Sequence, residues 1–173
     1  LQPWDRDFWE ERLREATYSV DEEALREFLA LPRVLDSMFQ LAYRLFGVKI
    51  EHSAAPLLHA NWMFFRVLDT VAGKYLGSFY LNPHAGEENT QTLVPRSRSK
   101  LPQELISLQL PRPVGGMPCL MRLKNIESLF HEFGHVLATM FTERFEFSEQ
   151  ERDNIEVMSF FMECWMYHKQ TFD

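Results

Sequence analysis

Two histidines and a glutamate form the clearest chemical pattern in this sequence. His131 and His135 lie four residues apart in the stretch "LFHEFGHVLATMF", and Glu132 follows the first of them. Residues four apart on a helix share a face, so both imidazoles can reach one metal ion. Zinc accepts neutral imidazole nitrogen, usually takes a third protein ligand and keeps one position for water. Glu132 is then placed to take a proton from that water, whose pKa the metal lowers to about 7.

The third ligand has to come from elsewhere in the chain. Glu156 lies on the next apolar segment, and a helical pair would bring that segment back across the first helix. Ser159 and Asp153 are each one turn from Glu156 on the same face and are candidates to orient the ligating groups. The residues alone leave a plainer interpretation open. An acidic residue near a helix start is common without a metal, and two histidines can lie partly exposed on a helix.

Helical patterns are predicted on both sides of a small sheet. Three amphipathic helices are expected within residues 1–47, and in the third Pro32 suits the start and Gly47 the end. Helices return after residue 124, where Asn125 is a plausible N-cap of the segment that carries the histidines. The last segment, residues 152–172, is also expected to be helical.

The segment 48–110 has the character of a sheet. Residues 48–53, 61–69 and 74–82 are rich in aromatic and branched side chains, and the last two read as a hairpin. A long polar loop follows, and a short strand is expected in "ELISLQL". The predicted fold is mainly α with a small antiparallel β-sheet, an α+β arrangement. We expect residues 1–173 to form one zincin-like catalytic domain or a fragment of one, with the zinc-site helices in residues 124–173.

Composition limits the classes of function. The formal net charge of -7 argues against a general nucleic-acid binder, which would show a basic stripe. No apolar run approaches the roughly 20 residues of a membrane span. The two cysteines, Cys119 and Cys164, favour reduced thiols in an intracellular compartment, and Cys164 is expected to be buried. The chain opens on Leu1, so we expect a mature form or a piece, with any targeting segment not visible.

The remaining histidines and aromatic residues are expected to be structural. His52 and His59 have no partner at metal-ligand spacing, and His168 is expected at the surface. The aromatic run "WMFF", residues 62–65, is expected in the core. His84 lies in a polar loop near the presumed substrate side, and its role is open.

Several longer stretches resemble the zinc metallopeptidase family of thimet oligopeptidase, neurolysin and oligopeptidase A. These stretches are "RVLDSMFQLAYRLFGVKIE", "GSFYLNP", "PVGGMPCLMRLKNIESLFHEFGHVL" and "ERDNIEVMSFFMECWMYH". The resemblance implies that His131, His135 and Glu156 bind Zn²⁺ and that Glu132 is the general base. It also implies a mainly helical enzyme that encloses a channel and cleaves short peptides inside cells, in the cytoplasm or in a mitochondrion or chloroplast.

The sequence departs from this family at several points. The segment after "FYL" is polar where the family is rich in glycine, Met158 stands where proline is common, and the connection between the two zinc-site helices is shorter. The resemblance places the tyrosine and histidine that hold the substrate carbonyl beyond Asp173. These departures motivate an alternative. The chain would then be a shortened, catalytically impaired homologue that serves as a structural or interaction subunit of a larger assembly.

Overall fold

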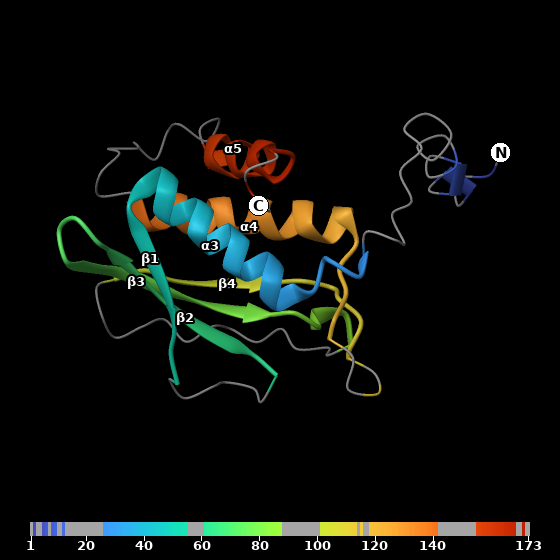
Figure 1. Ribbon diagram of the computed structural model, residues 1–173, viewed down its shortest axis with the longest axis horizontal. Helices are drawn as coiled ribbons and strands as arrows, with labels where there is room; N and C mark the ends of the chain where they lie inside the picture. The colour runs from blue at the N-terminus through green and yellow to red at the C-terminus, as the bar shows by residue number, and fades with distance from the viewer. Residues whose placement is uncertain are drawn as a thin grey trace.

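The computed structural model describes residues 2, 5–6, 8–9, 12, 26–54, 61–87, 101–113, 115, 118–141, 155–168 and 171. The two helices expected before residue 31 lie largely outside these residues, as does His59. Within the described residues the chain forms three α-helices and four strands: α3 and α4 form a layer against the sheet, and α5 lies on top of this layer (Figure 1). No helix in this part of the chain has the length and apolar character needed to cross a bilayer.

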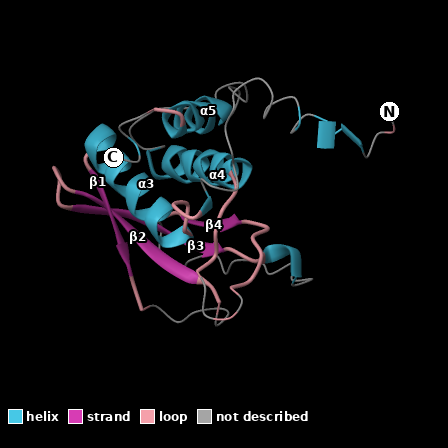
Figure 2. Cartoon of the chain, turned by 45° about the vertical axis from the view of Figure 1, so that its right-hand side comes forward, coloured by secondary structure: helices cyan, strands magenta, loops and turns pink. Residues whose placement is uncertain are grey.

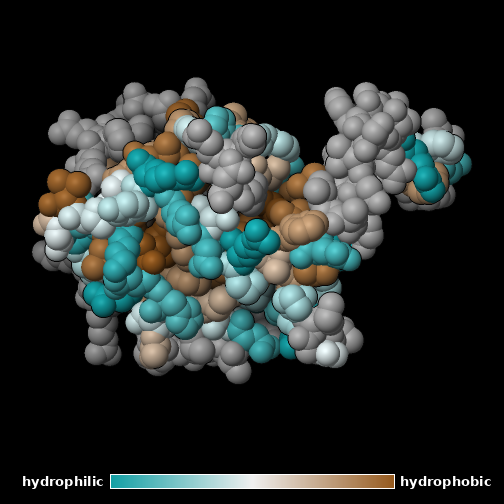
Figure 3. Space-filling model, viewed as in Figure 1, coloured by the Kyte–Doolittle hydropathy of each residue, from teal (hydrophilic) through white to brown (hydrophobic). Residues whose placement is uncertain are grey.

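The first long helix, α3 (Leu31–Phe46), has the predicted boundaries. Pro32 occupies its first turn, where a missing N–H costs nothing, and Gly47 ends it with a φ of 67°. Its apolar stripe, which includes Val34, Met38 and Leu41, is buried. In the space-filling view, hydrophilic residues lie over α3 on the side turned toward the viewer, as expected for an amphipathic helix (Figure 3).

The sheet consists of β1 (Val48–His52), β2 (Met63–Asp69), β3 (Lys74–Asn82) and β4 (Gln103–Ser107), in that order. The predicted hairpin is confirmed, because β2 pairs with β3 in antiparallel fashion across a short turn. The predicted α+β fold with a small sheet is confirmed. The strands β1, β2 and β3 are antiparallel as expected, whereas β4 runs parallel to β3, so the sheet is mixed. A long connection, which includes the 3₁₀ turn η2 (Ala85–Glu87), separates the two strands and lets the chain return to the same end of the sheet.

The second long helix, α4 (Leu123–Phe141), lies on the same face of the sheet as α3 (Figure 2). It begins before the predicted N-cap, so the prediction for Asn125 was wrong. The Asn125 side chain instead accepts a hydrogen bond from the Arg122 backbone N–H, at 3.1 Å. The chain just before α4 also pairs with the chain just before α3, through Leu31 N–H to Cys119 O at 3.0 Å and Met121 N–H to Leu29 O at 2.8 Å.

An aromatic cluster joins the two helices to the sheet. Phe39 of α3 lies 5.1 Å from Phe65 of β2 and 6.0 Å from Phe133 of α4, measured between ring centroids. Phe79 of β3 contacts Phe133 at 6.0 Å. Phe133 is a neighbour of the predicted site residues along α4, so this core fixes the rotation of the helix that carries them. On the opposite face of the sheet, Trp62, Phe64 and Tyr80 form a second buried cluster.

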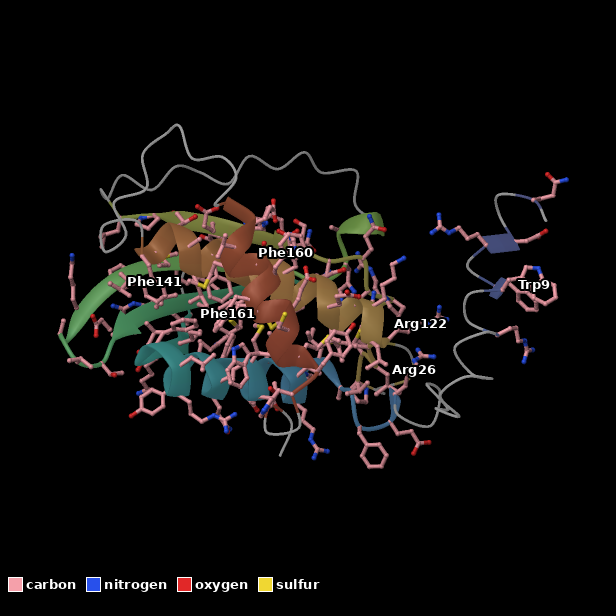
Figure 4. The ribbon with its side chains drawn as sticks, turned by 90° about the horizontal axis from the view of Figure 1, so that it is seen from above. Trp9, Arg26, Arg122, Phe141, Phe160 and Phe161 are labelled. Atoms are coloured by element: carbon pink, nitrogen blue, oxygen red, sulfur yellow. The ribbon has the colours of Figure 1, made fainter. Side chains whose placement is uncertain are left out.

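The third helix, α5 (Ile155–Met166), packs on α4 on the side away from the sheet. Seen from above, α5 crosses over α4 (Figure 4). Met162 and Met166 are buried beneath it, whereas Val157, Phe160 and Phe161 are exposed. The helix ends at Met166, before the predicted end, and the residues of the predicted segment before Ile155 are outside the described part of the chain.

Candidate metal centre

The helix α4 brings the two motif histidines together. Its buried face, including Phe130 and Leu137, turns His131 and His135 toward α5, where each is only partly exposed. Their Nε2 atoms lie 3.1 Å apart, and their rings meet edge to face. The pattern of i and i+4 therefore produces the paired imidazoles that the sequence predicted.

The helix α5 brings Glu156 to the same point. Glu156 Oε2 lies 3.3 Å from His131 Nε2 and 3.4 Å from His135 Nε2. The Ser159 hydroxyl, one turn further along α5, lies 2.8 Å from the same Glu156 oxygen and 2.9 Å from the Glu156 carbonyl oxygen. A donated hydrogen bond from Ser159 orients the carboxylate. Asp153, the other residue expected beside Glu156, lies outside the described residues.

The close approach of the two helices depends on Gly134. A Cβ at this position would lie 2.7 Å from the Met158 carbonyl oxygen and 2.8 Å from the Ser159 nitrogen, nearer than real Cβ contacts allow. Gly134 sits between the two histidines in sequence, and the α5 backbone therefore rests directly on α4 at the level of the site. This confirms the expectation that Gly134 leaves room for a neighbour.

The spacing of the three donor atoms matches the geometry that zinc requires. Zinc–nitrogen and zinc–oxygen bonds of about 2.0–2.1 Å in a tetrahedron place neighbouring ligand atoms about 3.3–3.4 Å apart. The distances among the Nε2 atoms and the Glu156 oxygen are 3.1, 3.3 and 3.4 Å. The donor set, two imidazole nitrogens and one carboxylate oxygen, is also one that zinc accepts. Among the residues that the structure describes, His131, His135 and Glu156 are the group able to hold a metal ion.

A second glutamate of α5 contacts His131 from the other side of the ring. Glu163 Oε1 forms a hydrogen bond with His131 Nδ1, so the two ring nitrogens have different partners. The Nδ1–H group of His131 donates a hydrogen bond to Glu163, and the lone pair of His131 Nε2 points toward Glu156 and His135. This arrangement fixes the tautomer of the His131 ring, as hydrogen-bond partners of metal-binding imidazoles do. The spacing of the two glutamates in the sequence could have predicted this contact. Glu156 and Glu163 are two helical turns apart and therefore share one face of α5.

A carboxyl group of the sheet lies beside α4, about one helical turn from the site. Glu104 of β4 forms a hydrogen bond with Thr139 of α4, one turn beyond His135. Burial raises the pKa of Glu104, while the hydrogen bond from Thr139 and the charge of His135 oppose that change. The Thr139 hydroxyl also lies 3.1 Å from the His135 carbonyl oxygen. Sequence reasoning missed Glu104, because only the strand pairing shows that it faces α4.

The predicted general base, Glu132, lies next to His131 on α4 and is partly buried. The other histidines are apart from this cluster. His84 is buried, with Nδ1 2.9 Å from the Leu110 carbonyl oxygen, which indicates a structural role. His52 is exposed at the end of β1, and His168 is exposed beside Trp165.

The cysteines differ from expectation in one case. Cys119 is buried, and its Sγ lies 3.3 Å from the Pro111 carbonyl oxygen. The expectation that Cys164 is buried was wrong, because Cys164 is exposed. Cys164 lies on the side of α5 opposite the buried Met162. Because α5 has apolar residues on both sides, its sequence does not indicate which side packs against the rest of the protein.

Comparison with known proteins places this geometry in a family. The sequence matches Peptidase family M3 over residues 1–173. The organellar oligopeptidase A (chloroplastic/mitochondrial) of Arabidopsis thaliana is 38% identical over 97% of this chain, and the probable cytosolic oligopeptidase A of the same plant is 36% identical over 99%. The oligopeptidase A of Escherichia coli is 29% identical over 99%.

These alignments cover 24%, 27% and 27% of the three relatives. The chain therefore spans about a quarter of the length of the relatives it matches. Because the family match runs over the entire sequence, the chain belongs to Peptidase family M3. The predicted resemblance is confirmed.

Proposed function

We propose that this chain forms the catalytic metal centre of a zinc-dependent metalloendopeptidase that cleaves short peptides. His131, His135 and Glu156 hold the zinc ion, and Glu132 is the general base. One observation carries the proposal. Three donor atoms from two helices converge at separations of 3.1–3.4 Å, which suit three corners of a zinc tetrahedron. Membership of a peptidase family supports the same function.

The chemistry divides between the metal and the protein. A bound zinc ion supplies Lewis acidity, which polarises a peptide carbonyl and acidifies water. The Glu132 carboxylate takes a proton from the attacking water and delivers it to the nitrogen of the departing amine. Glu163 holds His131 through Nδ1, and Ser159 holds Glu156, so the ligating atoms are oriented before substrate arrives.

The class of substrate and the compartment follow from the relatives. All three relatives named above are called oligopeptidase A, and the names of the two plant proteins place one in chloroplasts and mitochondria and the other, as probable, in the cytosol. We therefore propose an oligopeptide substrate and an intracellular location for this protein. About three-quarters of the length of these relatives is not matched by the 173 residues. Peptide hydrolysis by this chain on its own is therefore proposed as well.

The experiment measures zinc content and peptide cleavage on the same samples. The wild-type chain is compared with Glu132→Gln and His135→Ala, using a quenched fluorescent peptide. Glu51→Gln is the matched control, because Glu51 pairs with Lys49 on β1, at the sheet edge opposite β4. We expect one zinc ion per chain in the wild type and in Glu132→Gln, and much less in His135→Ala. Cleavage should be lost in both site variants and retained in the control.

The outcomes separate the competing functions. A wild-type chain that does not bind zinc contradicts the metal centre. Zinc binding with cleavage that persists in Glu132→Gln contradicts the role of the base. Zinc binding without any cleavage that depends on Glu132 would favour the alternative of a structural or interaction subunit.

A further inference from the structure

The carboxyl group of Glu104 lies on the side of the sheet that faces the metal centre. Glu104 pairs with Phe79 across the parallel β3–β4 ladder, and Phe79 packs against Phe133 of α4. Ile106, two residues further along β4, is buried in the same core. Side chains alternate along a strand, so Glu104 and Ile106 point toward α4 while Leu105 packs against the second cluster on the opposite face.

Glu104 is also close to the site along the axis of α4. Its hydrogen-bond partner Thr139 lies four residues after His135, which corresponds to about 5–6 Å along a helix. The Thr139 hydroxyl also lies 3.1 Å from the His135 carbonyl oxygen, so it connects Glu104 to the helical turn of a proposed zinc ligand. The strand β4 is the last strand of the described sheet, next to α4.

We infer that Glu104 is a specificity residue that selects a lysine or arginine side chain in the peptide, within about two residues of the cleaved bond. This inference rests on the proposed peptidase function. An extended peptide advances about 3.3 Å per residue, so one helical turn of α4 corresponds to roughly two substrate positions. A lysine or arginine stem can lie along apolar surface and carry its charge to the Glu104 carboxylate.

Burial and charge favour a cation as the partner. Taking a carboxylate out of water disfavours its charged form, and this is the main cause that raises the pKa of Glu104. A cationic side chain of the substrate would offset that cost, whereas an acidic one would add to it. The other acidic residues of the site, Glu132, Glu156 and Glu163, give the surroundings the same sign of charge. The proposed zinc ion offsets only part of this charge.

A purely structural role for Glu104 makes a different prediction. Its hydrogen bond with Thr139 would then be its whole function, and substitution by glutamine would keep a hydrogen-bonding group of the same shape. Glu104→Gln separates these possibilities, because it removes the charge and retains the side-chain volume. Glu104→Lys reverses the charge.

The test uses phosphinic pseudopeptides, in which a phosphinate replaces the scissile amide, with the zinc-loaded chain of 173 residues. Ligands differ only in carrying lysine, norleucine or glutamate at one of the two positions on either side of the phosphinate. Affinities are measured by fluorescence anisotropy, so turnover is not required. At one position the wild type should bind lysine about fivefold more tightly than norleucine, as expected for a partly exposed ion pair.

The variants decide the inference. The lysine-to-norleucine ratio of affinities should fall to about one in Glu104→Gln and below one in Glu104→Lys, and it should stay at the wild-type value in Glu51→Gln. The inference is overturned if the wild type does not discriminate at any position, or if Glu104→Gln keeps the wild-type ratio. Failure of every ligand to bind in a zinc-dependent manner overturns the proposed function and the inference together, so the two failures are distinguishable.

Discussion

The contact between Glu163 and His131 predicts a measurable share of the zinc affinity. Glu163 accepts the hydrogen bond from His131 Nδ1 and leaves Nε2 to face Glu156 and His135. Removal of such a partner typically weakens metal binding 10- to 100-fold, which corresponds to about 1.4–2.8 kcal/mol. We expect Glu163→Ala to raise the Kd for zinc by this factor.

The conservative variant gives an intermediate value. Glu163→Gln keeps an oxygen that can accept the hydrogen bond from His131 but loses the charge. Charge-assisted hydrogen bonds are roughly twice as strong as neutral ones, so about half of the free energy should remain. The Kd for zinc should therefore rise about three- to tenfold in Glu163→Gln, between the wild type and Glu163→Ala.

The assay is competition for zinc with a chromophoric chelator, and circular dichroism checks that each variant is folded. Cys164→Ser is the control, because Cys164 is the exposed neighbour of Glu163 on the same helix and points away from the site. Its Kd should equal that of the wild type. If Glu163→Ala folds and binds zinc as tightly as the wild type, the assignment of Glu163 as the group that positions His131 is wrong.

Three further predictions follow from the packing and the burial of single side chains. Gly134→Ala should lower both zinc affinity and the free energy of unfolding, the latter by about 1–3 kcal/mol, because α5 must move off the new Cβ. A thiol reagent should label Cys164 quickly in the native protein, and Cys119 only after denaturation, since burial removes access to that thiol and raises its pKa. Glu104→Gln should stabilise the metal-free protein, relative to the wild type, more at pH 7 than at pH 4. The raised pKa of Glu104 means that its ionisation costs native-state stability once the pH passes the ordinary value of 4.5, and urea unfolding at both pH values measures the difference.

The parts of the site that depend on local periodicity could be predicted from the sequence. His131, Glu132 and His135 lie on one helix, and their spacing alone determines that the imidazoles share a face. The boundaries of α3 could also be predicted, because the backbone preferences of Pro32 and Gly47 favour the start and the end of a helix. Glu156 was a candidate from its place on the next helical segment and was supported by the resemblance, but its position beside the histidines depends on how two helices pack.

The parts that the sequence did not predict depend on contacts between distant segments. Glu163 contacts His131 only because Gly134 lets α5 lie so close to α4. Glu104 reaches the site through the parallel pairing of β4, which was not expected, since local patterns reveal hairpins but not the partner of a strand after a long connection. Asn125 shows a different, local limit, because α4 starts two residues before it and its side chain accepts a hydrogen bond from the Arg122 backbone N–H, just ahead of the helix.

The metal centre and the packing of α5 should stabilise each other. A helix of 12 residues is marginal in isolation, and α5 leaves Val157 and Phe160 exposed while Met162 and Met166 anchor it. Its polar face carries the proposed ligand Glu156 and the two groups proposed to orient ligands, Ser159 and Glu163, all directed at α4. A cation shared by both helices binds only when α5 is in place, so its binding free energy adds to the docking of that helix. The same side chains that would activate the metal for chemistry therefore also hold the last helix on the fold.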